Sequence, residues 1–139
     1  MPSTDFLAAA VRWRKDTQAL SASGSAESLD HMAGLAAECA CKVLLHWLGA
    51  PLAPSGGLDS KRLWVHLPQV LDELLSLASG RSSVKIIAQL PYPNPFNDWS
   101  IDDRYVEDGA IGGTSLNAHR DGLEAVFAAL QAAALDGEL

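Results

Sequence analysis

Two ionisable residues, Glu38 and Lys42, lie in the middle of the most apolar helix-like stretch of the chain, which runs from Ala26 to Leu48. The acid precedes the base by four residues, so the two side chains can pair along one face of a helix. Apolar residues surround the pair on most sides of such a helix, which predicts that the helix is buried. We therefore expect a pair in the core, because an unpaired buried carboxylate is strongly destabilising.

A carboxylate accepts more than one donor, and the segment WSIDDRY, from Trp99 to Tyr105, offers a second cation. We expect Arg104 and Tyr105 of this segment to meet Glu38 and Lys42. Arg104 would then fasten the segment to the helices through charge-assisted hydrogen bonds. The alternative is that the same cluster lines a ligand or nucleotide pocket.

The sequence does not favour a metal site. Cys39 and Cys41 would point about 200° apart on a helix, so they cannot form a disulfide and supply half a zinc site at best. Five acids between positions 98 and 108 are suitable ligands for Mg²⁺ or Ca²⁺, but they lack the spacing of a calcium loop. We predict free buried thiols, a solvated acidic loop, no metal and no cofactor.

These residues must be positioned by helices. Helical periodicity predicts four long helices, over Thr4 to Leu20, Ala26 to Leu48, Ser60 to Ser79 and Thr114 to Leu135. Ser3 or Thr4 is the expected cap of the first helix. Its predicted buried stripe consists of Phe6, Leu7, Ala10, Val11, Trp13, Thr17 and Leu20.

Two segments leave alternatives open. Pro68 removes a backbone donor from the third helix, so either that helix kinks or a new one begins there. The short apolar segment at 82–90 fits a helix or a strand, and we favour a helix because no partner strand is evident. The short connector after Leu20 favours an antiparallel hairpin of the first two helices. The sequence predicts a single all-α domain over residues 1–139, an antiparallel bundle of four to five helices.

A long loop should precede the last helix. Residues 91–113 contain three prolines and three glycines, which exclude long regular structure. Aromatic side chains in this segment would be costly to leave in water, so the loop should be ordered and packed over the helices. The four aromatic residues are Tyr92, Phe96, Trp99 and Tyr105.

Charge and composition limit the partners. The 139 residues carry 17 acids against 10 Lys and Arg, a formal charge of −7 that opposes capture of RNA or nucleotides. No apolar run reaches the ~20 residues that span a bilayer. Charges near the N-terminus follow the apolar segment, the reverse of a signal peptide. We expect a cytoplasmic protein without membrane association.

Two motifs carry a family resemblance. MAGLAAECACK, from Met32 to Lys42, resembles the second helix of HEPN domains, small helical domains linked to RNA and nucleotide transactions. WSIDDRY resembles a W-x-x-x-x-R-Y signature of some bacterial HEPN-like proteins. Together the motifs bracket nearly the whole chain. The resemblance implies an up-and-down helical bundle, often dimeric, found in RNases of toxin and defence systems and in catalytically silent relatives.

The RNase chemistry implied by this resemblance needs an arginine followed four to six residues later by a histidine, so that both flank a scissile phosphate. Arg62 stands too close to His66, although both would share a helical face and could form a degenerate site; a surface pair is the alternative. His119 opens the last helix, where the family's catalytic histidine is often found, but no arginine precedes it at a suitable spacing. These three residues are the catalytic candidates, and the missing spacing predicts no robust RNase activity.

Two functions follow from the sequence. The first is a HEPN-like bacterial cytosolic component of a toxin–antitoxin or defence-type module involved in RNA or nucleotide transactions. The alternative is a non-enzymatic acidic binding or immunity protein that neutralises a basic partner by charge complementarity. The expected partners are a second copy of the chain and a toxin or antitoxin protein. The homodimer would use an exposed apolar patch that includes at least one of Trp13, Trp47 and Trp64.

Overall fold

A computed structural model describes residues 2–81 and 83–135 and confirms the predicted all-α bundle. The described residues form no sheet, and the one β-bridge among them joins Leu52 to Leu58. The α-helices are α1 (Phe6–Ala19), α2 (Ala26–Trp47), α3 (Gln69–Gly80), α4 (Val84–Gln89) and α5 (Gly113–Leu135), and the two short 3-10 helices are η1 (Lys61–Leu63) and η2 (Ile101–Tyr105).

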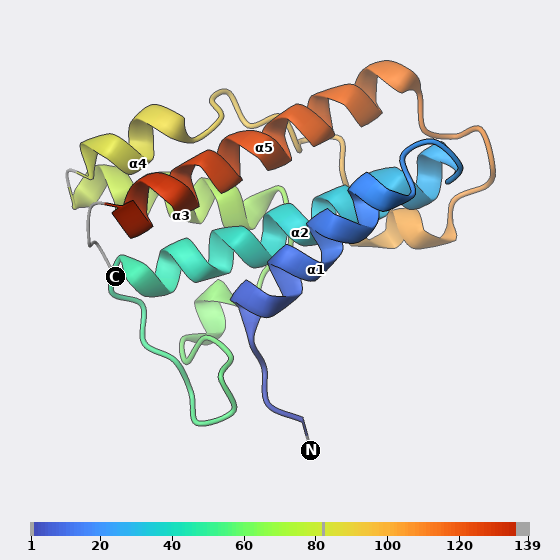
Figure 1. The fold of residues 1–139 in the computed structure, drawn as a ribbon. Helices are drawn as coiled ribbons and strands as arrows, with labels where there is room; N and C mark the ends of the chain where they lie inside the picture. The colour runs from blue at the N-terminus through green and yellow to red at the C-terminus, as the bar shows by residue number, and fades with distance from the viewer. Residues whose placement is uncertain (1, 82, 136–139) are drawn as a thin grey trace.

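Helix α2 lies at the centre of the bundle. It contacts α1, α3, α5 and η2, and α4 packs between α3 and α5 (Figure 1). Helices α1 and α2 form the predicted antiparallel hairpin, and α5 also runs antiparallel to α1 across the same face (Figure 1). The neighbours can approach closely because four alanines of α2 are fully buried, at positions 33, 36, 37 and 40. The core therefore forms around α2.

The first helix begins later and buries less than predicted. Its cap is Asp5, whose Oδ1 accepts a hydrogen bond from the Ala8 amide, rather than Ser3 or Thr4. Thr4 is occupied elsewhere, because its amide donates to the Ser55 carbonyl. Of the predicted stripe, Ala10 and Thr17 are buried, whereas the large side chains of Leu7, Val11 and Leu20 are exposed. Ala10 and Thr17 of α1 face α2, because the alanines of α2 allow the two helix backbones to approach closely.

The third predicted helix is divided. Residues 61–63 form η1, residues 64–68 are not helical, and α3 begins at Gln69. Pro68 explains the division, since it lacks an amide proton and disfavours helical geometry in the residue before it. Of the two alternatives at Pro68, a new helix is therefore the observed one. The segment at 82–90 contains the helix α4 and no strand among its described residues.

The predicted loop before α5 is ordered, but only two of its four aromatic residues are buried. Trp99 and Phe96 dock on glycines of α2 and α5, Gly34 and Gly122, where an added Cβ would lie 2.0 Å and 2.8 Å from the respective ring atoms. Tyr92 and Tyr105 remain 85% and 76% exposed. An aromatic side chain of this loop is therefore buried where a helix glycine leaves space for the ring, and aromatic character alone is not sufficient.

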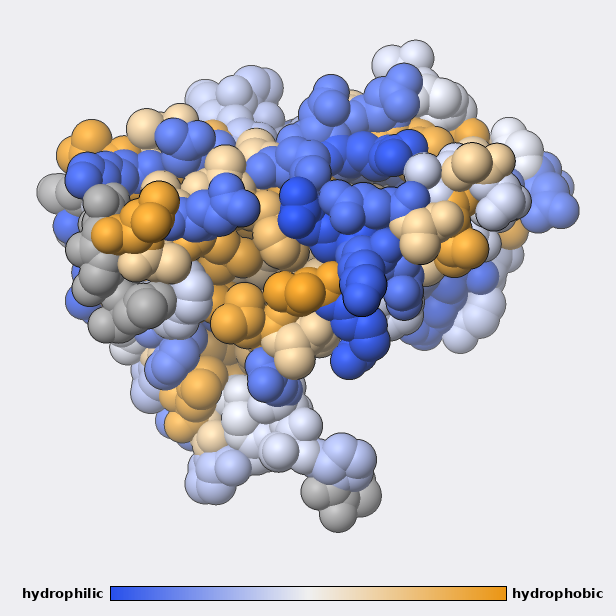
Figure 2. Space-filling view, viewed as in Figure 1, coloured by the Kyte–Doolittle hydropathy of each residue, from blue (hydrophilic) through white to orange (hydrophobic). Residues whose placement is uncertain are grey.

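The face that carries α1 and α5 is mixed in character. Figure 2 shows strongly hydrophilic side chains over its centre, next to an apolar patch. Arg14 of α1 joins α5 through a bidentate pair with Glu124, at 2.8 and 2.9 Å. Leu7 and Val11, one turn apart on α1, are 43% and 50% exposed. Helix α1 thus presents both apolar and charged side chains to solvent.

Candidate functional site

Three of the predicted site residues meet at one place, which we call the Glu38 cluster: Glu38, Lys42 and His66. Glu38 is 6% exposed, and the expected pair with Lys42 is confirmed, with Nζ at 3.6 Å from Oε2. The other Glu38 oxygen, Oε1, faces His66 Nδ1 at 3.0 Å and accepts from the Leu67 amide at 3.1 Å. The buried carboxylate therefore has three partners, and its charge is matched by Lys42.

The contact with Glu38 orients the imidazole of His66. A carboxylate at Nδ1 favours a ring that carries a proton on Nδ1, so Nε2 accepts a hydrogen bond in the neutral imidazole and donates one only in the imidazolium. Nε2 has no bonding partner among the described residues, and the side chain is 53% exposed. The arrangement presents one imidazole nitrogen to solvent in a fixed direction.

Arg104 and Tyr105 do not join this cluster, so the predicted clamp on Glu38 is wrong for the described residues. Both side chains are exposed, and the Arg104 guanidinium lies 4.8 Å from the ring centroid of Tyr105. The reason is the register of the loop along α2. Trp99 donates its indole proton to the Asp30 carbonyl, which places η2 beside the first half of α2. Arg104 instead shares a 330 Å³ hollow with His31.

His119 occupies a second polar cluster, in the interior. It is 1% exposed, and its Nδ1 and Nε2 lie 2.5 Å from Asp30 Oδ1 and 2.7 Å from Asp98 Oδ1. Two carboxylates require two N–H donors, which the imidazolium supplies. Burial alone would lower the pKa of His119, but the hydrogen bonds to both acids raise it above its ordinary value. The charged ring thus joins α5 to α2 and to the loop.

Asp98 completes this second cluster at the surface. Its side chain is 59% exposed, and its Oδ2 accepts a hydrogen bond from the Ser115 hydroxyl at 2.7 Å. Burial would raise the pKa of Asp98, but the hydrogen bonds from Ser115 and His119 lower it. Sequence reasoning missed the partners of His119. The one available signal was an acid, Asp30, inside an apolar helical stretch, since an acid in such a place needs a buried donor.

The remaining catalytic candidate, Arg62, lies apart from both histidines. Its guanidinium pairs with Glu73 of α3 at 2.5 Å. Arg62 and His66 do not share the predicted helical face, because η1 ends at Leu63. Among the described residues, the three candidates therefore contact three different sets of acids.

The thiols and the acids form no metal site in the described part of the chain. No group of three or more His, Cys, Asp and Glu side chains there could hold a metal ion. Cys39 and Cys41 are free, as predicted, and Cys41 is fully buried while Cys39 is partly buried. Burial raises the pKa of the Cys39 thiol to about 11, so it is protonated at neutral pH. Among the described helices, none has the length and apolar character needed to cross a membrane.

Comparisons with known proteins do not assign the chain to a family. No family model matches the chain, and searches of curated proteins and of solved structures gave no significant match.

Proposed function

We propose that this chain is a HEPN-like cytosolic protein that lacks RNase activity and acts as a binding partner in a toxin–antitoxin or defence-type module. One observation carries the proposal: the three candidate catalytic side chains contact separate sets of acids and do not converge on one point. Arg62 pairs with Glu73, His66 with Glu38, and His119 with Asp30 and Asp98. An RNase of the implied type needs an arginine and a histidine that converge on one phosphate.

His119 argues most strongly against RNA cleavage. A general acid or base must come within hydrogen-bond reach of the proton it transfers, and both His119 nitrogens already face carboxylates. Those carboxylates would also repel a phosphodiester. The same groups explain the role that this histidine has instead, which is to hold the loop on the helices.

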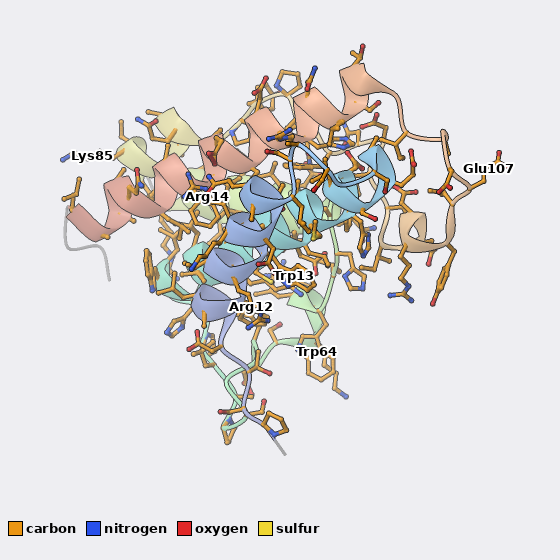
Figure 3. The ribbon with its side chains drawn as sticks, turned by 45° about the vertical axis from the view of Figure 1, so that its right-hand side comes forward. Arg12, Trp13, Arg14, Trp64, Lys85 and Glu107 are labelled. Carbon is orange, nitrogen blue, oxygen red and sulfur yellow. The ribbon has the colours of Figure 1, made fainter. Side chains whose placement is uncertain are left out.

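The charge of the chain favours a basic partner protein. The chain has a formal charge of −7, and acids are exposed at the tip of the loop, at Asp102, Glu107 and Asp108. Figure 3 shows Glu107 at the outer edge of the molecule, directed away from the bundle. An exposed aromatic ring, Tyr105, stands between these acids in the sequence, with the Arg104 guanidinium 4.8 Å from its centroid. Acidic side chains around an aromatic anchor suit recognition of a basic surface.

Two measurements test the proposal. The purified chain, incubated with RNA in the absence of metal ions, should cleave it no faster than a His119→Ala variant does. The product of the adjacent gene, co-expressed with the chain, should bind it with an affinity that falls as salt rises. Asp102→Lys and Glu107→Lys should weaken that complex, whereas Asp16→Lys, at an exposed acid of α1, serves as the matched control. Rapid RNA cleavage that disappears in His66→Ala or His119→Ala would refute the proposal.

A further inference from the structure

A hollow of 390 Å³ adjoins the Glu38 cluster, and we call it the Lys42 pocket after Lys42, which lines it with Phe6, Trp64 and His66. Its size lies in the range of small-molecule sites, about 300 to 1,000 Å³. The N-terminal segment and the loop before η1 form its walls. They are joined by the hydrogen bond from the Thr4 amide to the Ser55 carbonyl, at 2.6 Å.

Trp64 gives this pocket an aromatic wall. It is 62% exposed, yet its indole Nε1 donates to the Leu58 carbonyl at 2.6 Å, which fixes the ring against the loop. Figure 3 shows Trp64 at the lower edge of the molecule, beside the loop and apart from the α-helices. The Trp64 ring is immobilised and exposed to solvent. A second ring can therefore stack on it without a further loss of side-chain conformational entropy.

Hydrogen-bond donors line the inner part of the Lys42 pocket. The Lys42 ammonium has three N–H groups, and Glu38 is its one acidic partner among the described residues. The same ammonium lies 5.4 Å from the Phe6 ring centroid. His66 adds its Nε2, which no described group bonds and which donates when the ring is the imidazolium. The negative charge of Glu38 is matched by the Lys42 ammonium at 3.6 Å, and Oε1 also accepts from the Leu67 amide and faces His66 Nδ1. A ligand would therefore meet donors next to an aromatic face.

We propose that the Lys42 pocket binds a small ligand in which an aromatic ring carries an anionic group, a carboxylate or a phosphate. The ring stacks on Trp64, and the anionic oxygens accept hydrogen bonds from Lys42 and from Nε2 of the His66 imidazolium. This assignment is independent of the proposed protein-binding function, because the pocket lies on residues that the loop tip does not include.

Phenyl phosphate and benzoate are the probes for the two anionic groups, and inorganic phosphate and phenol are the matched half-ligands. Each is titrated into the full ¹⁵N-labelled chain, and the four tryptophan indole signals are followed. The Trp64 signal, identified by its loss in Trp64→Leu, should shift and saturate with a dissociation constant below about 1 mM for at least one probe. Either half-ligand should bind about tenfold more weakly or worse. The signal of the buried Trp99 should stay in place.

Variants locate the site. Trp64→Leu and His66→Gln should each weaken binding of the better probe by about tenfold, while Tyr92→Leu, at a more exposed ring, should leave it unchanged. Lys42→Met should also weaken binding, but this variant leaves Glu38 short of a partner and can lose stability. His66→Gln therefore decides the question, since His66 is half exposed.

Three results would overturn the proposal. The first is the absence of a saturable shift with either probe. The second is an affinity that is equal for inorganic phosphate and phenyl phosphate or unchanged in Trp64→Leu and His66→Gln. The third is a Trp64 signal that moves with protein concentration and not with the probe, which would assign this surface to a second copy of the chain.

Discussion

His119 holds three parts of the molecule together, because its ring nitrogens contact Asp30 of α2 and Asp98 of the loop while its backbone belongs to α5. The ring also stacks on Phe96, with centroids 5.5 Å apart. Asp30 depends on this contact. Its Oδ2 is buried without a hydrogen-bond partner among the described residues, so its pairing rests on Oδ1 and His119. Loss of the imidazole would leave a buried charge uncompensated.

We expect His119→Ala to lower the free energy of unfolding by about 3 kcal/mol, the lower end of the range for breaking a buried pair. Urea denaturation followed by circular dichroism measures the change. His46→Ala is the control, since His46 is exposed and contacts the Ala50 carbonyl at the end of α2. A stability of His119→Ala within about 0.5 kcal/mol of the parent, the usual range of surface substitutions, would mean that the cluster contributes little.

The same cluster predicts a pH dependence with a defined sign. The folded-state pKa of His119 is raised above its ordinary 6.5, so its contribution is complete below about pH 6.5 and is lost as the pH rises through the folded value. The pKa of Asp98 is lowered from 3.8, so its contribution is present above that value and is lost as the pH falls through its folded value. Asp98 contributes less, because its side chain is 59% exposed.

The measurement compares unfolding free energies of the parent and His119→Gln in a pH series. The difference between the two should be largest between about pH 4 and 6.5 and should shrink on the alkaline side. His46→Gln should leave the parent profile unchanged. A difference that grows toward alkaline pH would show that the neutral imidazole, and not the imidazolium, is the stabilising form.

At the scale of elements, two glycines decide how the loop meets the helices. We expect Gly34→Ala to lower the unfolding free energy by about 2 kcal/mol, because overpacking a core costs about 1 to 3 kcal/mol and Trp99 cannot move without losing its bond to the Asp30 carbonyl. The alanine would otherwise favour the helix by about 1 kcal/mol. Thermal melts measure the change in stability. Near-ultraviolet circular dichroism follows the packing of the tryptophans, of which Trp99 is the most buried.

Gly80→Ala provides the matched control for Gly34→Ala. Gly80 is also helical, but an added Cβ there would meet no atom within 4 Å. This variant should melt at or slightly above the parent temperature. Equal melting of Gly34→Ala and Gly80→Ala would mean that Trp99 can repack without cost.

Local patterns in the sequence predicted the parts of the structure that local interactions determine. The spacing of Glu38 and Lys42 predicted their pair, and the apolar run around them predicted a buried α2. The His119 cluster joins residues 89 and 21 positions apart, which no periodicity can pair. The docking of Trp99, and not of Tyr105, depends on the absence of a Cβ at Gly34, and sequence patterns do not show that the two residues meet. Pro68 predicted either a kink or a new helix, and the sequence alone did not distinguish the two.

At the scale of the whole molecule, we predict a homodimer. Leu7 and Val11, one turn apart on α1, expose apolar side chains that a second copy of the chain could cover. Light scattering at high micromolar concentration should give twice the 14.7 kDa of one chain. Val11→Glu should shift that mass toward the single chain, whereas Val84→Glu, at a site 72% exposed on α4, should not. A single-chain mass for the parent at that concentration would contradict the prediction.

Three anchors of the long loop lie close together in the sequence. Phe96, Asp98 and Trp99, which hold the loop to α5, His119 and α2, fall within four consecutive residues. Three contacts on so short a stretch of backbone must form and break in a single cooperative event. Double-mutant cycles among them should then be strongly non-additive, because the first loss already releases the other two. We therefore expect residues 96–99 of the loop to dock and open as one unit.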